Sequence, residues 1–134
     1  MSKSILMLCD DNSKISIIAQ AVLNHYVKNV TVESAAVKKS KTIDKNVKSA
    51  LVKDGSWLDE YSAKTLDKVQ DREYDLVIAL SSSAGKFTKE FSDETIVIQI
   101  EYDDLETHNS TTLERFIKTI KMELIPITRD ILEL

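Results

Sequence analysis

The amino-acid sequence predicts an α/β fold, a single three-layer domain with a four-stranded parallel sheet flanked by helices. The first observation is two fully apolar runs of the kind that parallel sheets bury on both faces. The second is that segments of helical periodicity alternate with the strand-like runs, which favours right-handed crossovers. The third is size, since 134 residues with 43% hydrophobic side chains suffice for one core. No linker-like stretch interrupts the sequence, so residues 1–134 are expected to form one domain.

The first half of the sequence begins with the apolar run SILMLC at residues 4–9, which predicts the first strand. Turn and cap residues follow, and apolar residues at helical spacing then predict a helix that ends near Tyr26. A short second strand is expected at residues 30–32. Ser34 and the lysine-rich residues 38–41 are expected in a solvated loop.

The middle of the sequence carries an amphipathic pattern at residues 43–51, which predicts a second helix. Gly55 is expected to terminate this helix, because glycine adopts the left-handed conformation of a helix C-cap readily. A short helical turn is predicted within residues 62–69.

The second half carries two further strands and a long helix. The apolar run LVIAL at residues 76–80 predicts a central strand, and the β-branched run TIVIQI at residues 95–100 predicts a fourth strand. From Thr112 onward, apolar residues at helical spacing predict the last helix. Pro126 is expected to kink or break that helix before Leu134.

Polar loops follow three of the predicted strands, at residues 10–13, 81–83 and 102–104. In open parallel sheets, ligands bind beyond the carboxyl ends of the strands. The three loops therefore define the expected functional edge of the domain.

Several segments at this edge resemble one family. ILMLCDDNSKIS is similar to the signature of low-molecular-weight protein tyrosine phosphatases and thioredoxin-coupled arsenate reductases, in which a strand ends in a cysteine before an anion-binding loop and a helix. ESAA resembles the Ser-Ala-Gly that follows the second strand of that family. YDLVIALS is similar to the arsenate reductase strand that ends in a redox cysteine, and EYDD resembles the Asp-Pro loop that carries the general acid. The order and spacing of these segments cover nearly the whole sequence.

The resemblance implies a low-molecular-weight phosphatase-like fold and a set of site residues. Cys9 would be the nucleophile and Asp104 the general acid. Ser81 and Ser82 would belong to the neighbouring loop. The anion loop would comprise Asp10, Asp11, Asn12, Ser13, Lys14, Ile15 and Ser16.

The sequence departs from the family pattern at residues that carry the chemistry. The family arginine falls on Ile15, the loop glycine on Asp11, the resolving cysteine on Ser81, and the proline after the catalytic aspartate on Leu105. An isoleucine cannot donate the paired hydrogen bonds with which a guanidinium stabilises a transferring phosphoryl group. Cys9 is the only cysteine, so arsenate reduction by an intramolecular thiol cascade is excluded.

The charges of the same loop also disfavour catalysis. The carboxylates of Asp10 and Asp11 are expected to repel a dianion and to raise the pKa of the Cys9 thiol. Lys14 could act as a substitute cation, although a point charge does not reproduce a bidentate guanidinium. Asp11 or Asn12 could alternatively occupy the anion site with its own side chain.

Three functions stay open at this point. The sequence favours a catalytically impaired domain that acts as a binding or regulatory module through the old active-site face. The alternative is a weak cysteine-dependent phosphatase, or an arsenate reductase that uses an external thiol, with Cys9 as nucleophile. A third possibility is a divalent-metal site formed by Asp10, Asp11, Asp103 and Asp104.

Composition narrows the partners. A net charge of −4 argues against nucleic acid as a partner. The apolar runs are too short for a signal peptide or a membrane span, so a cytoplasmic location without membrane contact is expected. No cofactor is expected, and a protein or a small oxyanion is the expected partner. The lysines of residues 38–41 could form a docking patch for an acidic partner, and the oligomeric state stays open.

Overall fold

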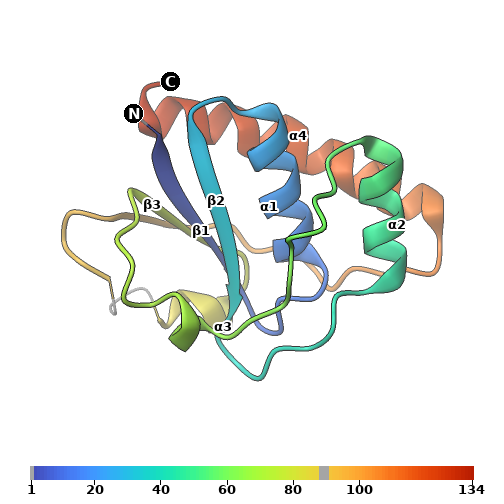
Figure 1. Cartoon of the computed structure of the whole chain (residues 1–134), viewed down its shortest axis with the longest axis horizontal. Helices are drawn as coiled ribbons and strands as arrows, with labels where there is room; N and C mark the ends of the chain where they lie inside the picture. The colour runs from blue at the N-terminus through green and yellow to red at the C-terminus, as the bar shows by residue number, and fades with distance from the viewer. Residues whose placement is uncertain (1, 88–90) are drawn as a thin grey trace.

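The fold is a three-layer α/β structure, as the sequence predicted. The computed structural model describes residues 2–87 and 91–134. Its four strands are β1 (Lys3–Cys9), β2 (Val30–Ala36), β3 (Leu76–Ala79) and β4 (Ile96–Gln99). They form one parallel sheet in the order β2-β1-β3-β4 (Figure 1). The prediction of a central strand at residues 76–80 is confirmed, because β3 lies between β1 and β4.

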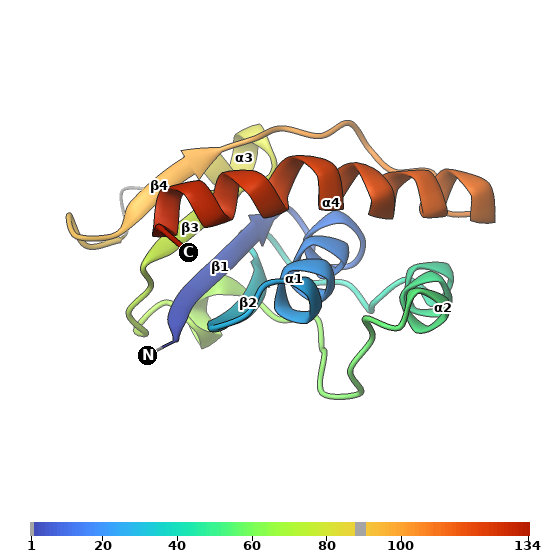
Figure 2. The ribbon, with the colours of Figure 1, turned by 90° about the horizontal axis from the view of Figure 1, so that it is seen from above.

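The helices cover the two faces of the sheet unequally. The longer helices are α1 (Ile15–Tyr26), α2 (Lys45–Asp54) and α4 (Ser110–Leu132), and α4 runs alongside α1 (Figure 2). Their buried side chains form the larger core cluster on one face. The other face is covered by shorter elements, the 3₁₀ helix η1 (Leu66–Lys68) and α3 (Ser82–Gly85).

Strand β1 is apolar at successive positions because both of its faces are buried. Ile5 and Met7 are buried in the larger cluster, whereas Leu6 and Leu8 are buried in the smaller one. Successive side chains of a strand point to opposite faces, so a strand that is covered on both faces needs apolar residues throughout. The carboxyl end of this rigid central strand positions Cys9.

Helix α2 has defined signals at both ends. The Asp44 carboxylate accepts hydrogen bonds from the backbone N–H groups of Asn46 (2.8 Å) and Val47 (3.1 Å). Gly55 ends the helix with φ of 86°, the left-handed conformation that the sequence predicted for it.

Strand β2 is longer than the sequence predicted. It continues to Ala36, so Ser34 lies in the sheet and is fully buried, and its expected place in a solvated loop was wrong. The hydroxyl of Ser34 donates to the side-chain oxygen of Gln20 at 2.5 Å. Burial of a hydroxyl is tolerated where it is hydrogen-bonded, and this buried partner could not be read from sequence.

Helix α4 also differs from the prediction, because it continues past Pro126 to Leu132 without a break. Proline has no N–H to donate to the carbonyl four residues earlier, which here belongs to Met122. Pro126 and Met122 both lie on the exposed side of the helix. We infer that water can solvate this carbonyl there, which makes the interruption tolerable.

The two ends of the chain lie on the same side of the sheet. Both ends of the chain lie near the amino ends of the strands, opposite the edge where the strands finish (Figure 1). None of the described helices is both long enough and apolar enough to cross a membrane.

Replacing the helical proline should stabilise the fold. Proline in a helix interior costs about 3 kcal/mol relative to alanine, and its lower entropy in the unfolded chain offsets about 1 kcal/mol. We expect Pro126→Ala to raise the free energy of unfolding by about 2 kcal/mol, measured by urea titration. The exposed Lys118→Ala serves as control and should change it by less than about 0.5 kcal/mol. A Pro126→Ala variant that is no more stable than the parent would contradict this account of α4.

Candidate functional site

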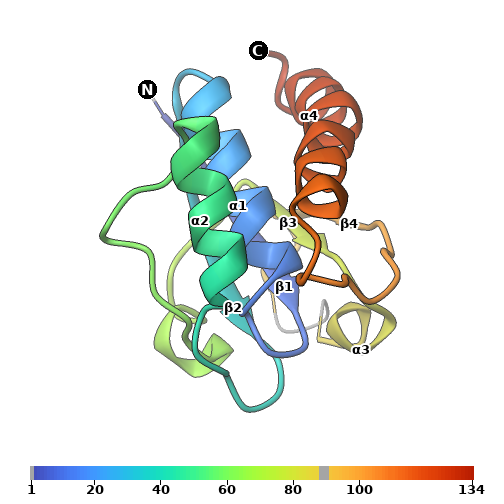
Figure 3. The same ribbon diagram turned by 90° about the vertical axis from the view of Figure 1, so that its right-hand side faces the viewer.

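The three polar loops that follow β1, β3 and β4 meet around one cavity of 260 Å³. This edge of the sheet is the lower end of the molecule in Figure 3, where α3 also lies. The lining residues are Cys9, Asp10, Asp11, Lys14, Ile15, Leu80, Ser81, Tyr102 and Asp104. The structure therefore brings the expected nucleophile, the expected acid and much of the expected anion loop together.

The loop after β1 is held from outside by the segment at residues 37–44. Four loop carbonyl oxygens accept backbone N–H groups from this segment, in the pairs Cys9 with Val37 (2.9 Å), Asp10 with Lys38 (3.0 Å), Asp11 with Lys41 (2.9 Å) and Ser13 with Asp44 (3.0 Å). In a trans peptide, the carbonyl and the following N–H point in opposite directions. The N–H groups of the residues that follow these carbonyls therefore point away from residues 37–44, and that of Asp10 donates to the Cys9 sulfur.

Asn12 fixes the shape of this loop. It is fully buried and adopts φ of 54°, a left-handed conformation that asparagine tolerates better than most residues. Its amide nitrogen donates to the hydroxyls of Ser16 (2.9 Å) and Ser34 (2.8 Å), and its side-chain oxygen accepts the backbone N–H of Lys64 (3.0 Å). Asn12 thus joins the loop to α1, β2 and the segment before η1, and its side chain does not occupy the anion site.

The Cys9 thiol is poorly suited to ionise. Burial is the largest effect and raises its pKa to about 11, and the negative charges of Asp10 and Asp11 raise it as well. The backbone N–H groups of Asp10 and Ser16 donate to the sulfur and partly oppose this shift. The helix N-terminus therefore still favours a thiolate, but burial and the two carboxylates outweigh it.

The two loop carboxylates have separate partners. Asp10 accepts the Ser81 hydroxyl at 2.7 Å and lies 3.7 Å from the Lys38 ammonium. Asp11 accepts the hydroxyl (2.8 Å) and backbone N–H (3.3 Å) of Ser13 and lies 3.5 Å from the Lys41 ammonium. Asp11 thus takes up one loop N–H with its own carboxylate. The pairing with Lys38 and Lys41 was not foreseen, because it depends on how residues 37–44 fold back over the loop.

Lys14, the cation that lines the cavity, contacts the loop that carries Asp104. The Lys14 ammonium lies 3.5 Å from the carbonyl oxygen of Leu105 and 4.0 Å from the carboxylate of Asp104. Ile15 lines the cavity with an apolar side chain that is 7% exposed. The position that carries arginine in the family pattern therefore contributes no donor.

The remaining expected site residues have supporting or peripheral positions. Ser81 caps α3, since its hydroxyl accepts the N–H of Ala84 at 3.1 Å. Ser13 and Ser16 are buried and hold the loop from behind. Ser82 and Asp103 are exposed and do not line the cavity.

Leu80 also lines the cavity, although the sequence analysis did not place it there, and Tyr102 lines it from the loop at residues 102–104 that was expected at this edge. Tyr102 lies in the EYDD segment, two residues before Asp104, and this spacing in the sequence indicated that it would lie near the cavity. Its backbone N–H donates to the carbonyl of Leu80 at 3.3 Å, which brings the loops after β3 and β4 together.

The aspartates do not gather as a metal site. Asp10, Asp11 and Asp104 border the cavity, but the first two carboxylates are engaged by separate partners, and Asp103 lies outside. Within residues 2–87 and 91–134, no group of three or more His, Cys, Asp or Glu side chains is arranged to hold a metal ion.

Comparison with known proteins agrees with the fold. Residues 4–119 match the family model for low molecular weight phosphotyrosine protein phosphatase. No curated protein matches the sequence.

Among solved structures, a thioredoxin-dependent arsenate reductase from Corynebacterium glutamicum is similar with a TM-score of 0.76 at 22% identity, and the match covers 97% of this chain and 62% of that one. An arsenate reductase from Archaeoglobus fulgidus gives a TM-score of 0.74 at 22% identity, covering 92% and 97% of the two chains. A low molecular weight phosphotyrosine phosphatase from Vibrio cholerae gives 0.79 at 16% identity, covering 96% of each.

Removing the Asn12 side chain should destabilise the whole domain. Asn12→Ala loses two buried hydrogen bonds and a third that is partly buried, and it leaves a residue without a polar side chain in the left-handed region. We expect the free energy of unfolding to fall by about 2–4 kcal/mol, measured by urea titration. Asn12→Gly should be about 1 kcal/mol more stable than Asn12→Ala. Both variants lose the hydrogen bonds, but glycine adopts the left-handed conformation without the steric cost that alanine has. An Asn12→Ala change below about 0.5 kcal/mol would show that the network does not hold the loop.

The raised pKa of Cys9 predicts its reactivity towards iodoacetamide. With a pKa of about 11, about one thiol in 10,000 is ionised at pH 7. Alkylation, followed by mass spectrometry, should therefore be slow at pH 7 and rise about tenfold per pH unit towards pH 10. Asp10→Asn should accelerate it by removing a repelling charge, whereas the exposed Asp103→Asn should not. A rate that levels off below about pH 8 would mean that the loop stabilises the thiolate after all.

Proposed function

The chain belongs to the low molecular weight phosphotyrosine protein phosphatase family, and from that premise we propose that it is a catalytically impaired member, which acts as a binding or regulatory module through the face around Cys9. The observation that carries the proposal is the cavity lining. It holds Ile15 where the family pattern has arginine, and a thiol whose pKa is raised to about 11.

The missing guanidinium affects the transition state most. Charge on the oxygens of a transferring phosphoryl group is stabilised by donors that are already in place, and a bidentate guanidinium is such a donor. Ile15 offers none, and the Lys14 ammonium is engaged by Leu105 and Asp104. The loop N–H groups that point away from residues 37–44 remain as donors, and without the guanidinium they would bind an anion rather than turn it over.

The charges on the cavity wall also disfavour a phosphate dianion. Three carboxylates line the cavity, those of Asp10, Asp11 and Asp104, and Lys14 is the only cation among the lining residues. Lys38 and Lys41 compensate Asp10 and Asp11, but they do so as exposed side chains outside the cavity lining. Their compensation is therefore partly screened by water.

A weak cysteine-dependent phosphatase or arsenate reductase is the second candidate. It is favoured by the two backbone N–H groups that donate to the Cys9 sulfur and by Asp104, which borders the same cavity. Asp104 is exposed, and its carboxylate lies 4.0 Å from the Lys14 ammonium. Arsenate reduction would in addition require an external thiol, because the chain has a single cysteine.

We propose a protein, or a small oxyanion held by the loop N–H groups, as the partner of this face. Both fit a cavity that keeps the loop but lacks the arginine. A partner that only binds does not need the thiolate, so binding should survive Cys9→Ser.

The decisive test is hydrolysis of p-nitrophenyl phosphate between about pH 5 and pH 8 by the parent protein and Cys9→Ser, with orthovanadate as competitor. We expect the two proteins to be indistinguishable and vanadate to have no effect, because neither ionised thiol nor guanidinium is available. Turnover that disappears with Cys9→Ser and with vanadate would overturn the proposal in favour of the enzyme.

A positive control restores the family pattern. The double variant Asp11→Gly/Ile15→Arg removes one carboxylate and supplies the guanidinium, so we expect vanadate-sensitive turnover to appear. If the parent and this variant were equally active, the departures at these positions would not be the cause of impairment.

A further inference from the structure

A second recess lies beside the cavity and has a different character. It is an open groove of 540 Å³, and the ion pair between Asp10 and Lys38 stands between it and the Cys9 cavity. Its lining residues are Ala36, Val37, Lys38, Lys39, Thr65, Leu66, Asp67, Gln70 and Phe87. They come from the end of β2 and the residues that follow it, from η1 and the residues on either side of it, and from the residues after α3.

The groove combines an apolar floor with a basic rim. Leu66 is buried, and Val37 and Phe87 are half-buried against the same core cluster, so each presents part of an apolar side chain to the groove. Lys38 and Lys39 are exposed at the rim. Asp67 is the single acidic lining residue, and its carboxylate accepts the Thr65 hydroxyl.

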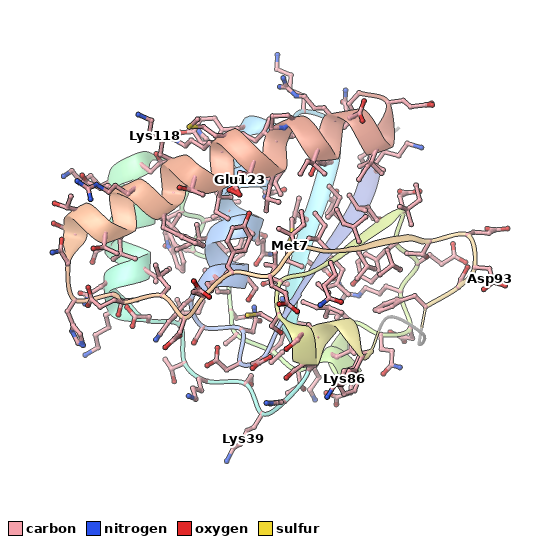
Figure 4. All side chains as sticks on the ribbon, turned by 180° about the vertical axis from the view of Figure 1, so that it is seen from behind. Met7, Lys39, Lys86, Asp93, Lys118 and Glu123 are labelled. Carbon is pink, nitrogen blue, oxygen red and sulfur yellow. The ribbon has the colours of Figure 1, made fainter. Side chains whose placement is uncertain are left out.

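The positive charge at this rim is less neutralised than in the groove between α2 and α4. In the groove between α2 and α4, Lys53 is paired with Glu114 at 2.8 Å and Lys121 with Asp54 at 2.7 Å. By contrast, Lys38 is 3.7 Å from Asp10, and Lys39 has no ion-pair partner in the described part of the chain. The exposed Lys86 lies at the same end of the molecule as Lys39 (Figure 4).

We propose that this groove docks a short acidic peptide segment of a partner protein, with one apolar or aromatic side chain inserted against Val37, Leu66 and Phe87. This inference rests on the proposed function, since it names the kind of partner that the face around Cys9 would contact. Carboxylates of the segment would pair with Lys38 and Lys39 while the anchor covers the floor. A long polyanion such as nucleic acid fits less well, because the chain carries a net charge of −4.

The groove predicts a specific pattern of peptide binding. The probe is a fluorescein-labelled peptide Glu-Asp-Glu-Phe-Glu-Asp-Glu, followed by fluorescence anisotropy at about 50 mM and about 300 mM NaCl. We expect saturable binding that weakens at the higher salt concentration. Peptides with Ser in place of Phe, or with Gln and Asn in place of the acids, should bind at least about fivefold more weakly.

Matched variants locate the binding site. Lys38→Glu/Lys39→Glu should weaken binding at least about fivefold. Arg115→Glu/Lys118→Glu makes the same change in net charge on α4 and should leave binding unchanged, since Lys118 lies far from Lys39 (Figure 4). Val37→Ser should reduce the advantage of the Phe peptide over the Ser peptide, and a thermal melt verifies that each variant is folded.

Three outcomes would overturn the groove assignment: no saturable binding of the Phe peptide, equal losses in the two charge-reversal variants, or tighter binding of a single-stranded oligonucleotide of equal charge. Failure of the proposed function is separable, because it is read from p-nitrophenyl phosphate turnover of the same preparations. An active phosphatase that still binds the peptide through Lys38 and Lys39 would refute the impairment and retain the groove.

Discussion

The buried amide of Asn12 is the constraint on which the functional edge depends. It holds one residue in a left-handed conformation and satisfies groups from α1, β2 and the segment before η1 at once. Because Ser16 and Ser34 are buried, each would lose a hydrogen bond without gaining water if the amide were absent. The network continues inward through Ser34 to Gln20, which donates to the backbone of β2 at 3.0 Å. The loop is therefore attached to the core through neutral groups.

This arrangement separates the shape of the loop from its charge. The residues that set the path of the backbone are Asn12, its serine partners and the carbonyls bound by residues 37–44. The residues that set the electrostatics are Asp10, Asp11, Lys14 and Ile15. The two groups meet at Asp11, whose carboxylate also accepts the hydroxyl and backbone N–H of Ser13.

The sequence alone predicted features that depend on local or periodic signals. The apolar run of β1, the left-handed Gly55 and the meeting of three polar loops at one edge follow from strand burial, helix capping and parallel topology. Features that depend on distant partners were missed. Ser34 looks like a loop residue until Gln20 is seen to accept its hydroxyl, and Pro126 looks like a helix breaker until its face of α4 is known to be exposed. The pairing of Lys38 with Asp10 likewise depends on the path of the backbone between them, which the hydrophobic periodicity of the sequence does not predict.

The position of the chain ends has a practical consequence. Both ends lie near the amino ends of the strands, whereas the cavity and the groove open beyond the carboxyl ends (Figure 1). An affinity tag, a fluorophore or a sensor surface attached at either end would therefore leave both recesses facing the solution. Protein immobilised through its N-terminus presents the same face to an analyte as protein immobilised through its C-terminus. Equal binding in the two orientations is therefore an internal control for specific binding.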